Sequence, residues 1–283
     1  MQLVIISGLS GSGKSVALKV LEDAYFYCVD NLPARLLVET ATFLRDAGYR
    51  HAAIAVDARS GDAQDTLPGA LRTLQAQGVD VRLLFLDAKD DTLIRRFSET
   101  RRKHPLADGT RTLEECILRE RELIGALAEL GARIDTSDVA ANTLRGWVKD
   151  LVTLEHPGMT LLFESFGFKQ GIPLDADLVF DVRCLPNPHY DEALRPLSGL
   201  DPEVAAFLER IDDVRRMEAD IADFLQRWLP CYLRDNRAYL TVAIGCTGGQ
   251  HRSVYFAERL AHRFQDQCAV LLRHRQLRPE TLA

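Results

Sequence analysis

Short apolar runs alternate with longer helical patterns through the first half of the chain. Four runs are continuous rather than alternating, as expected for strands buried on both faces of a parallel sheet: Leu3–Ser7, Tyr25–Val29, Ala52–Val56 and Val81–Leu86. Helical patterns lie between them, at Ser15–Ala24, Ala34–Ala47 and Thr66–Gln77. This strand–helix alternation predicts an α/β fold with a doubly wound parallel sheet.

A basic helical stretch follows the fourth run, at Thr92–Lys103, and then a loop at His104–Gly109. Residues 95–111 hold six basic and two acidic side chains, which fits either a lid that closes over phosphates or a solvated helical face. The pattern then predicts a helix over Thr112–Leu130, a strand over Ala132–Asp135 and a helix over Leu144–Leu154.

The sequence His156-Pro157-Gly158 interrupts the pattern and predicts a domain boundary near residue 155, giving domains 1–154 and 155–283. The second half again mixes strands and helices, so we expect a second α/β domain. Its expected strands are Thr160–Phe163, Asp177–Val182 and Tyr239–Ile244, and its expected helices are Pro202–Trp228 and Ser253–Gln265.

Charge and cysteine content narrow the classes of function. The net charge of −6 excludes a general polyanion binder, so any nucleic-acid contact requires a local basic patch. The six cysteines form no C-x-x-C pair, which argues against a zinc site and predicts reduced thiols in the cytoplasm. No apolar stretch approaches the ~20 residues that a membrane span needs.

A phosphate-binding motif lies between the first strand and the first helix. Its residues match G-x-x-x-x-G-K-[ST]: Gly8, Leu9, Ser10, Gly11, Ser12, Gly13, Lys14 and Ser15. The glycines allow backbone N–H groups to surround a phosphate, and the helix N-terminus favours negative charge. We expect Lys14 to reach the β- and γ-phosphates and Ser15 to ligate Mg²⁺. A second acidic group at a strand end, Asp57 or Asp87, could hold the metal or merely cap a helix.

A second glycine-rich loop, Gly245–Ser253, also lies between an apolar strand and a helix. Cys246 and Arg252 have the C-x₅-R spacing of cysteine-dependent phosphatases, followed by a serine. Three interpretations remain open: a phosphate-binding site without chemistry, a phosphatase with Cys246 as nucleophile, or a structural turn. Asp181 and His189 flank a proline-rich loop and could converge on the same site.

The end of the chain is basic, although the protein as a whole is acidic. Arg273, Arg275 and Arg278 suit a local RNA contact, or else a solvated tail.

The two loops together with five further motifs resemble the RapZ-type nucleotide-binding proteins, also called RNase adapter proteins. The resemblance covers both halves in order and rests on Ser7–Ser15, Val29–Pro33, Asp57–Ser60, Phe163–Lys169, Phe180–Arg183, Asn187–Tyr190 and Gly245–Ser253. It implies a kinase-like P-loop domain that binds ATP or GTP with weak hydrolysis, and a second domain similar to part of phosphofructokinase. It also implies that Asp57, Ala58, Arg59 and Ser60 contact a guanine nucleotide.

In characterised members the second domain binds small RNA, senses glucosamine-6-phosphate and presents the RNA to an endoribonuclease. The phosphosugar residues implied here are Asp181, His189, Thr247, Gly248, Gly249, Gln250 and Arg252. The family's lysine-rich tail is replaced by arginines in this chain. We therefore expect a cytoplasmic regulatory adapter, a homo-oligomer because avidity would help it grip RNA. A small-molecule kinase is the alternative.

Overall fold

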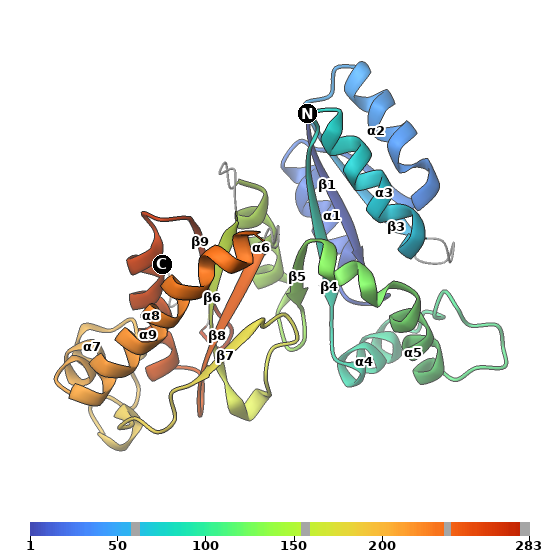
Figure 1. The fold of residues 1–283 in the computed structure, drawn as a ribbon. Helices are drawn as coiled ribbons and strands as arrows, with labels where there is room; N and C mark the ends of the chain where they lie inside the picture. The colour runs from blue at the N-terminus through green and yellow to red at the C-terminus, as the bar shows by residue number, and fades with distance from the viewer. Residues whose placement is uncertain (58–62, 154–158, 235–238, 278–283) are drawn as a thin grey trace. The chain divides into compact units, whose positions relative to one another are not determined.

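The computed structural model describes the chain except residues 58–62, 154–158, 235–238 and 278–283. The chain divides into two compact units, Met1–Thr153 and Leu154–Ala283, and each is α/β (Figure 1). None of the described helices combines the length and the apolar character needed to cross a bilayer.

The first unit is built on a parallel sheet whose described strands follow the order β2-β3-β1-β4-β5. Strand β1 is central and pairs in parallel with β3 and β4, which confirms the predicted doubly wound arrangement. The strands are β1 (Gln2–Gly8), β2 (Tyr27–Pro33), β3 (His51–Asp57), β4 (Asp80–Asp87) and β5 (Ala132–Asp135). β2 therefore extends four residues beyond the predicted run, with a register shift between Val29 and Leu32.

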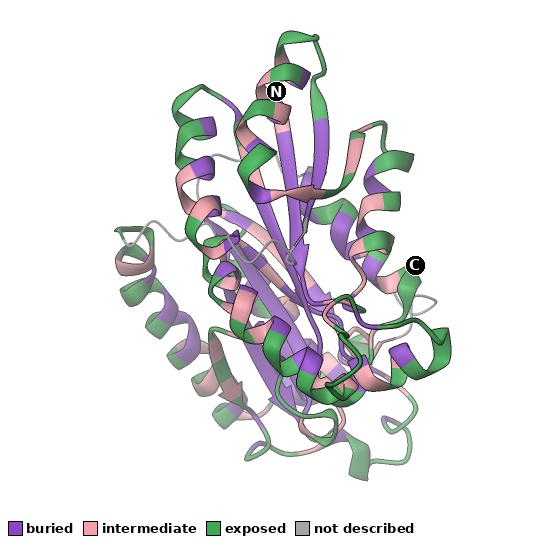
Figure 2. Ribbon diagram, turned by 90° about the vertical axis from the view of Figure 1, so that its right-hand side faces the viewer, coloured by how far each residue is buried: buried purple, intermediate pink, exposed green. Residues whose placement is uncertain are grey.

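Helices cover this sheet, and strands β1, β3 and β4 are largely buried beneath them, whereas the edge strand β2 is not (Figure 2). Helix α1 packs against α6, whereas α3 packs against α2 and α5. The helices are α1 (Lys14–Asp23), α2 (Leu37–Asp46), α3 (Ala63–Ala76), α4 (Asp90–Thr100), α5 (Leu113–Ile124) and α6 (Ala141–Thr153), with 3₁₀ turns η1 (Ala34–Leu36) and η3 (Gly125–Leu130). The long helix expected from Thr112 ends at Ile124 because the chain tightens into η3 there; Thr112 itself caps α5 with Glu115 in a capping box.

The second unit has its own parallel sheet, whose described strands follow the order β7-β8-β6-β9. The strands are β6 (Thr160–Gly167), β7 (Leu178–Asp181), β8 (Tyr239–Cys246) and β9 (Ala269–His274). The helices are α7 (Pro202–Glu209), α8 (Asp212–Arg234) and α9 (Arg252–Phe264), with short 3₁₀ turns η4 (Phe168–Gln170) and η5 (Pro188–Tyr190). The predicted second α/β fold is thus confirmed; its similarity to part of phosphofructokinase stays a prediction.

The single helix expected over Pro202–Trp228 is two helices. α7 ends at Glu209, and α8 begins anew at Asp212. Asp212 and Asp213 stand in the first turn of α8, where carboxylates favourably meet the positive end of the helix dipole.

The expectation of an exposed basic tail is wrong for Arg273 and Arg275. Arg273 belongs to strand β9, which the sequence patterns did not predict, and its side chain is buried. The Arg275 guanidinium is also covered and pairs with Glu164 at 3.3 Å and with Asp175 at 3.9 Å. Neither side chain is a surface cation: Arg273 is buried on β9, and Arg275, directly after that strand, is covered and paired with carboxylates. Arg278 lies outside the described residues.

We expect the core of the second unit to be sensitive to the loss of one aromatic ring. Phe264 on α9 is fully buried, and its ring lies 5.9 Å from that of Phe163 on β6. Phe264→Ala removes this packing and should lower the free energy of unfolding by about 3–5 kcal/mol, measured by urea denaturation. Leu233→Ala, at a half-exposed position on α8, is the matched control and should change it by less than about 1 kcal/mol. Equal losses in the two variants would contradict this packing.

Candidate functional site

The first loop leaves the central strand at the carboxyl edge of the sheet, where ligands bind in open α/β folds. A Cβ on Gly8 would lie 2.1 Å from the Leu86 carbonyl oxygen of the neighbouring strand, so no side chain fits there. Gly11 and Gly13 have φ values of +84° and +107°, a region that favours glycine. Gly13 caps α1, so the N–H groups of the first helical turn face the loop.

A cavity of about 570 Å³ opens over this loop. Residues 10–16 form its floor, and Lys14 donates a hydrogen bond to the Gly8 carbonyl. Gly8 and Leu9 precede these residues and are buried outside the cavity lining. The other lining residues are Asp30, Asn31, Arg96, Phe97, Glu99, Thr100, Arg102, Lys103, Pro105, Val139, Ala141 and Leu144. The basic segment after β4 therefore borders the phosphate loop, as a closing lid requires.

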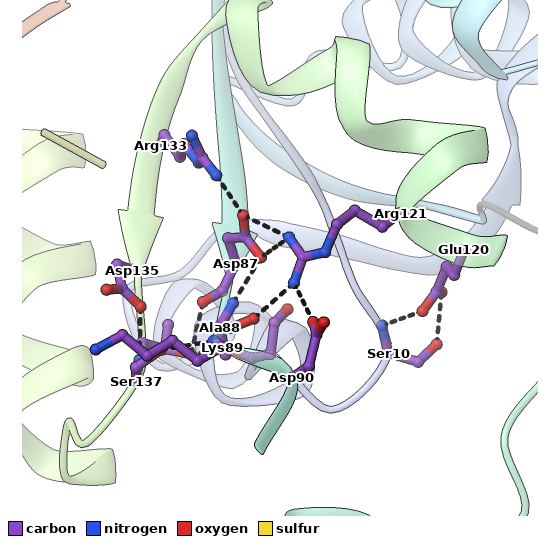
Figure 3. Close-up of polar contacts among 12 residues, drawn as sticks. Ser10, Asp87, Ala88, Lys89, Asp90, Glu120, Arg121, Arg133, Asp135 and Ser137 are labelled. Carbon is purple, nitrogen blue, oxygen red and sulfur yellow. Dashed lines mark hydrogen bonds and ion pairs between the residues drawn. The ribbon is translucent and has the colours of Figure 1, made fainter. Parts of the chain in front are cut away.

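A buried carboxylate anchors the loop from the side. Glu120 on α5 accepts hydrogen bonds from the Ser10 N–H at 2.8 Å and from the Ser10 hydroxyl at 2.7 Å (Figure 3). Its Oε2 also lies 3.2 Å from His104 Nε2, and since the Leu106 N–H donates to His104 Nδ1, the ring donates through Nε2. Burial opposes ionisation of Glu120, but the bond from His104, the charge of Lys14 and the bonds from Ser10 hold its pKa below the usual value.

Arg96 on α4 ties the loop to the segment after β5. Its Nη1 donates to the Gly11 carbonyl at 3.0 Å and to the Thr136 hydroxyl at 3.0 Å, while Nη2 donates to the Thr136 carbonyl at 2.6 Å. The Thr136 hydroxyl in turn lies 2.8 Å from the Ser12 carbonyl. These contacts hold the loop at Gly11 and Ser12, next to the Ser10 contact of Glu120.

Asp87, at the end of β4, is already engaged by two arginines (Figure 3). Arg121 Nη1 contacts both of its carboxylate oxygens, at 2.9 and 3.1 Å, and Arg133 Nη2 contacts Oδ2 at 2.6 Å. The N–H of Ala88 donates to Oδ1 at 2.8 Å. A carboxylate that is buried and so fully bonded is a structural ion pair rather than the second metal-holding group considered from the sequence.

Mg²⁺ needs few protein ligands beside a nucleotide, because phosphate and water oxygens complete its octahedron. The Ser15 hydroxyl lines the cavity at the start of α1 and fits that role. Asp57 ends β3, next to the central strand, and its side chain lies outside the described set. Ala58, Arg59 and Ser60 lie wholly outside the described residues. Among those that are described, no cluster of three or more His, Cys, Asp or Glu side chains could hold a metal by itself.

The second loop repeats this arrangement in the other unit. It joins the end of β8 at Cys246 to α9, which begins at Arg252. Cys246 Sγ accepts a hydrogen bond from the Gly249 N–H at 3.2 Å and lies 3.2 Å from the Ser253 hydroxyl. Burial opposes ionisation of this thiol, but the bonds from Ser253 and Gly249 and the charge of Arg252 hold its pKa below the ordinary value.

Arg252 is almost completely buried and only partly engaged. Its Nη1 donates to the carbonyls of Arg183 at 2.9 Å and Leu185 at 2.6 Å, and Nη2 lies 3.4 Å from the Thr247 hydroxyl. Within the described part of the chain, Nε meets no acceptor. The edge formed by Nε and Nη2 is the one that a guanidinium uses for bidentate phosphate binding.

A pocket of about 290 Å³ lies at this loop. Five of the seven residues expected from the resemblance line it, namely His189, Thr247, Gly248, Gln250 and Arg252. The other two do not line it. The Gly249 N–H donates to Cys246 Sγ. Asp181 forms a surface ion pair with Arg183, whose Nε lies 2.9 Å from Oδ1 and whose Nη2 lies 2.7 Å from Oδ2. The remaining lining residues are Lys169, Gln170, Asn187, Cys246 and His251.

Sequence reasoning missed the side chains that reach the loops from distant elements. Glu120 carried no local signal, because it lies 110 residues from Ser10. Arg96 belongs to the basic stretch Thr92–Lys103, whose pattern does not single it out. Lys169 was part of the family motif Phe163–Lys169, yet no role was given to it.

Family models match both halves of the chain. A RapZ-like N-terminal domain covers residues 1–155, and a RapZ C-terminal domain covers residues 159–278. A nucleotide-binding protein of Azoarcus is 61% identical over 97% of this chain and 94% of its own length. One from Thiobacillus denitrificans is 60% identical over 98% of this chain and 100% of its own.

Solved structures add weaker likenesses. A shikimate kinase from Bacteroides thetaiotaomicron has a TM-score of 0.38 at 14% identity and covers 54% of this chain and 98% of its own. A gluconokinase from Sinorhizobium meliloti has a TM-score of 0.33 at 14% identity and covers 55% and 98%. At these scores the likeness says nothing further about this chain. The family models and full-length relatives, by contrast, agree over both units, and the chain belongs to the RapZ family.

Proposed function

We propose that this chain is a regulatory protein that binds a nucleoside triphosphate, ATP or GTP, with Mg²⁺ in its first unit and a phosphosugar in its second. Each unit offers a glycine-rich loop between a buried parallel strand and a helix N-terminus, with a cation and a cavity beside it. Relatives with about 60% identity are called nucleotide-binding proteins, which supports the first half of the proposal.

The observation that carries the second half is the Nε of Arg252, a buried donor that meets no acceptor among the described residues. A buried N–H without an acceptor is unfavourable by about 1–3 kcal/mol, so a phosphate oxygen that accepts from Nε would relieve this cost. Lys169 and His189 line the same pocket, where an ammonium group and an imidazole ring can contact a phosphate. The amide side chains of Gln170, Asn187 and Gln250 suit the hydroxyl and amino groups of a sugar. Glucosamine-6-phosphate, which the family resemblance implies, has this chemistry.

A role as an adapter that presents small RNA to an endoribonuclease remains part of the proposal. Its support is the family membership rather than a basic tail, because Arg273 and Arg275 are buried. The RNA would have to meet other cations, and log affinity should then fall linearly with log salt. Homo-oligomerisation and a cytoplasmic location likewise stay predictions.

A small-molecule kinase is the alternative, and one observation favours it. Asp30 and Asn31 line the triphosphate cavity. A carboxylate there could receive a proton from an acceptor hydroxyl. A kinase transfers the γ-phosphate rapidly to a defined acceptor, whereas an adapter hydrolyses the triphosphate slowly and without one.

We expect Lys14→Ala to weaken binding of Mg²⁺-ATP and Mg²⁺-GTP about 10- to 100-fold, because it removes a charge-assisted contact to the phosphates. Isothermal calorimetry on the full chain measures this directly. Lys19→Ala, at an exposed position on the same helix, is the matched control and should bind as wild type. Unchanged affinity in Lys14→Ala would refute the assignment of the first loop.

We expect Arg252→Lys to lose at least about tenfold in affinity for glucosamine-6-phosphate, because an ammonium cannot replace a bidentate guanidinium edge. Arg263→Lys on the same helix, a surface residue that pairs with Asp223, is the control. Thr247→Val, at an exposed position of the loop, should weaken binding of the sugar phosphate without disturbing the fold. It tests the site even if Arg252→Lys fails to fold. Full affinity in both loop variants would contradict the proposed site.

A further inference from the structure

The second loop has features that phosphate binding alone does not require. Its sequence is C-x-x-G-x-x-R-S, running from Cys246 through Gly249 and Arg252 to Ser253. Gly249 has a φ of +75°, so the position favours glycine, and this conformation accompanies the N–H contact to Sγ. A Cβ at this position would also lie 2.7 Å from the Gly167 nitrogen.

Two backbone N–H donors and one hydroxyl, which can donate to a thiolate or accept from a thiol, surround the sulfur. The Gly249 N–H and the Ser253 hydroxyl lie 3.2 Å from Sγ, and the Ser253 N–H adds a further bond from the first turn of α9. A neutral thiol needs no such set of donors, because sulfur is a weak acceptor until it is ionised. The arrangement therefore stabilises a thiolate at the base of the pocket, and the lowered pKa of Cys246 agrees with it.

Arg252 supplies an independent indication that a phosphate belongs above this sulfur. The residue is 97% buried (relative exposure 3%), two backbone carbonyls fix its Nη1, and Nε meets no acceptor among the described residues. Arg252 and Cys246 line the same pocket. A phosphoryl group gripped by the Nε–Nη2 edge would lie next to the thiolate.

We propose that Cys246 is the nucleophile of a phosphoryl-transfer step on a phosphate monoester bound at this loop. The proposal rests on the proposed phosphate binding at the same loop and adds covalent chemistry to it. The thiolate lone pair forms an S–P bond while the ester P–O bond breaks. The departing oxygen keeps that electron pair and takes a proton from the His189 imidazolium, an exposed ring in the pocket lining.

Water completes the cycle. Its oxygen forms a bond to phosphorus, the S–P bond breaks, and the electron pair returns to Sγ. His189, now neutral, takes the proton of the attacking water. The net reaction converts one phosphate monoester and one water into an alcohol and inorganic phosphate, with no oxidant or metal consumed.

The test follows the full-length protein with para-nitrophenyl phosphate and, separately, with glucosamine-6-phosphate. Acid-quenched samples are examined by intact mass and by peptide mapping for phosphocysteine at position 246, and phosphate release is measured in parallel. We expect wild type to show the phosphorylated Cys246 peptide and to release phosphate. Cys246→Ser should lose at least 100-fold of that release while it still binds inorganic phosphate by calorimetry.

Cys268→Ser, a half-buried cysteine of the same unit outside the pocket, is the matched control and should behave as wild type. His189→Asn should slow release from the sugar phosphate more than from the nitrophenyl ester, whose leaving group needs less help from an acid. Inorganic phosphate should protect Cys246 from alkylation by iodoacetamide.

The outcomes separate this inference from the proposed function. If glucosamine-6-phosphate binds wild type and Cys246→Ser alike, with no phosphocysteine and no release, the covalent step is overturned and the sensor role stands. If phosphocysteine forms from the nitrophenyl ester but the sugar phosphate does not bind, the phosphosugar assignment fails and the nucleophile stands. Equal release from wild type and Cys246→Ser would mark a contaminating phosphatase and overturn the inference.

Discussion

Both candidate sites depend on one steric constraint: near the end of a buried parallel strand, a glycine is packed so closely that an added Cβ would collide with its neighbours. At Gly8 an added Cβ would collide with the Leu86 carbonyl of the adjacent strand. At Gly245 it would lie 2.4 Å from the Phe168 ring. The loop that follows each glycine leads to a helix N-terminus, which places backbone N–H groups at the carboxyl edge of the sheet. Cavities, cations and anchoring residues are arranged around that turn.

The two units differ in how they hold buried charge beside these loops. In the first, Asp87 accepts hydrogen bonds from two arginines and a backbone N–H. These contacts connect β4 to α5 and β5. In the second, Arg252 is fixed at only one end of its guanidinium, and the other end faces an incomplete set of acceptors. A saturated ion pair supports a fold, whereas a buried guanidinium held only by neutral acceptors suits a ligand of the opposite charge.

Strands and loops could be predicted from the sequence where their pattern depends on neighbouring residues. Site residues that come together only through tertiary packing could not. Continuous apolar runs predicted β1, β3, β4 and β8, and glycine spacing located both loops, because each depends on neighbouring residues. Glu120 could not be found, because it meets Ser10 only through the tertiary packing of α5, which contacts α3 and α4. The stretch that became β9 is a short apolar run followed by Arg273 and His274, and only its pairing with β6 distinguishes it from a basic tail.

The bonds among Ser10, His104 and Glu120 restrict how this protein can change over time. All three are held in one network, and His104 and Glu120 have almost no contact with solvent. Replacing His104 by an apolar residue would remove one donor from the buried Glu120 carboxylate, and replacing Glu120 would take the acceptor away from both the Ser10 loop and the His104 ring. The effects of substitutions at these positions, which are far apart in the chain, therefore depend on one another. A change at Glu120 would therefore be accommodated more easily together with a change at His104, because the two side chains share a contact that has almost no access to solvent.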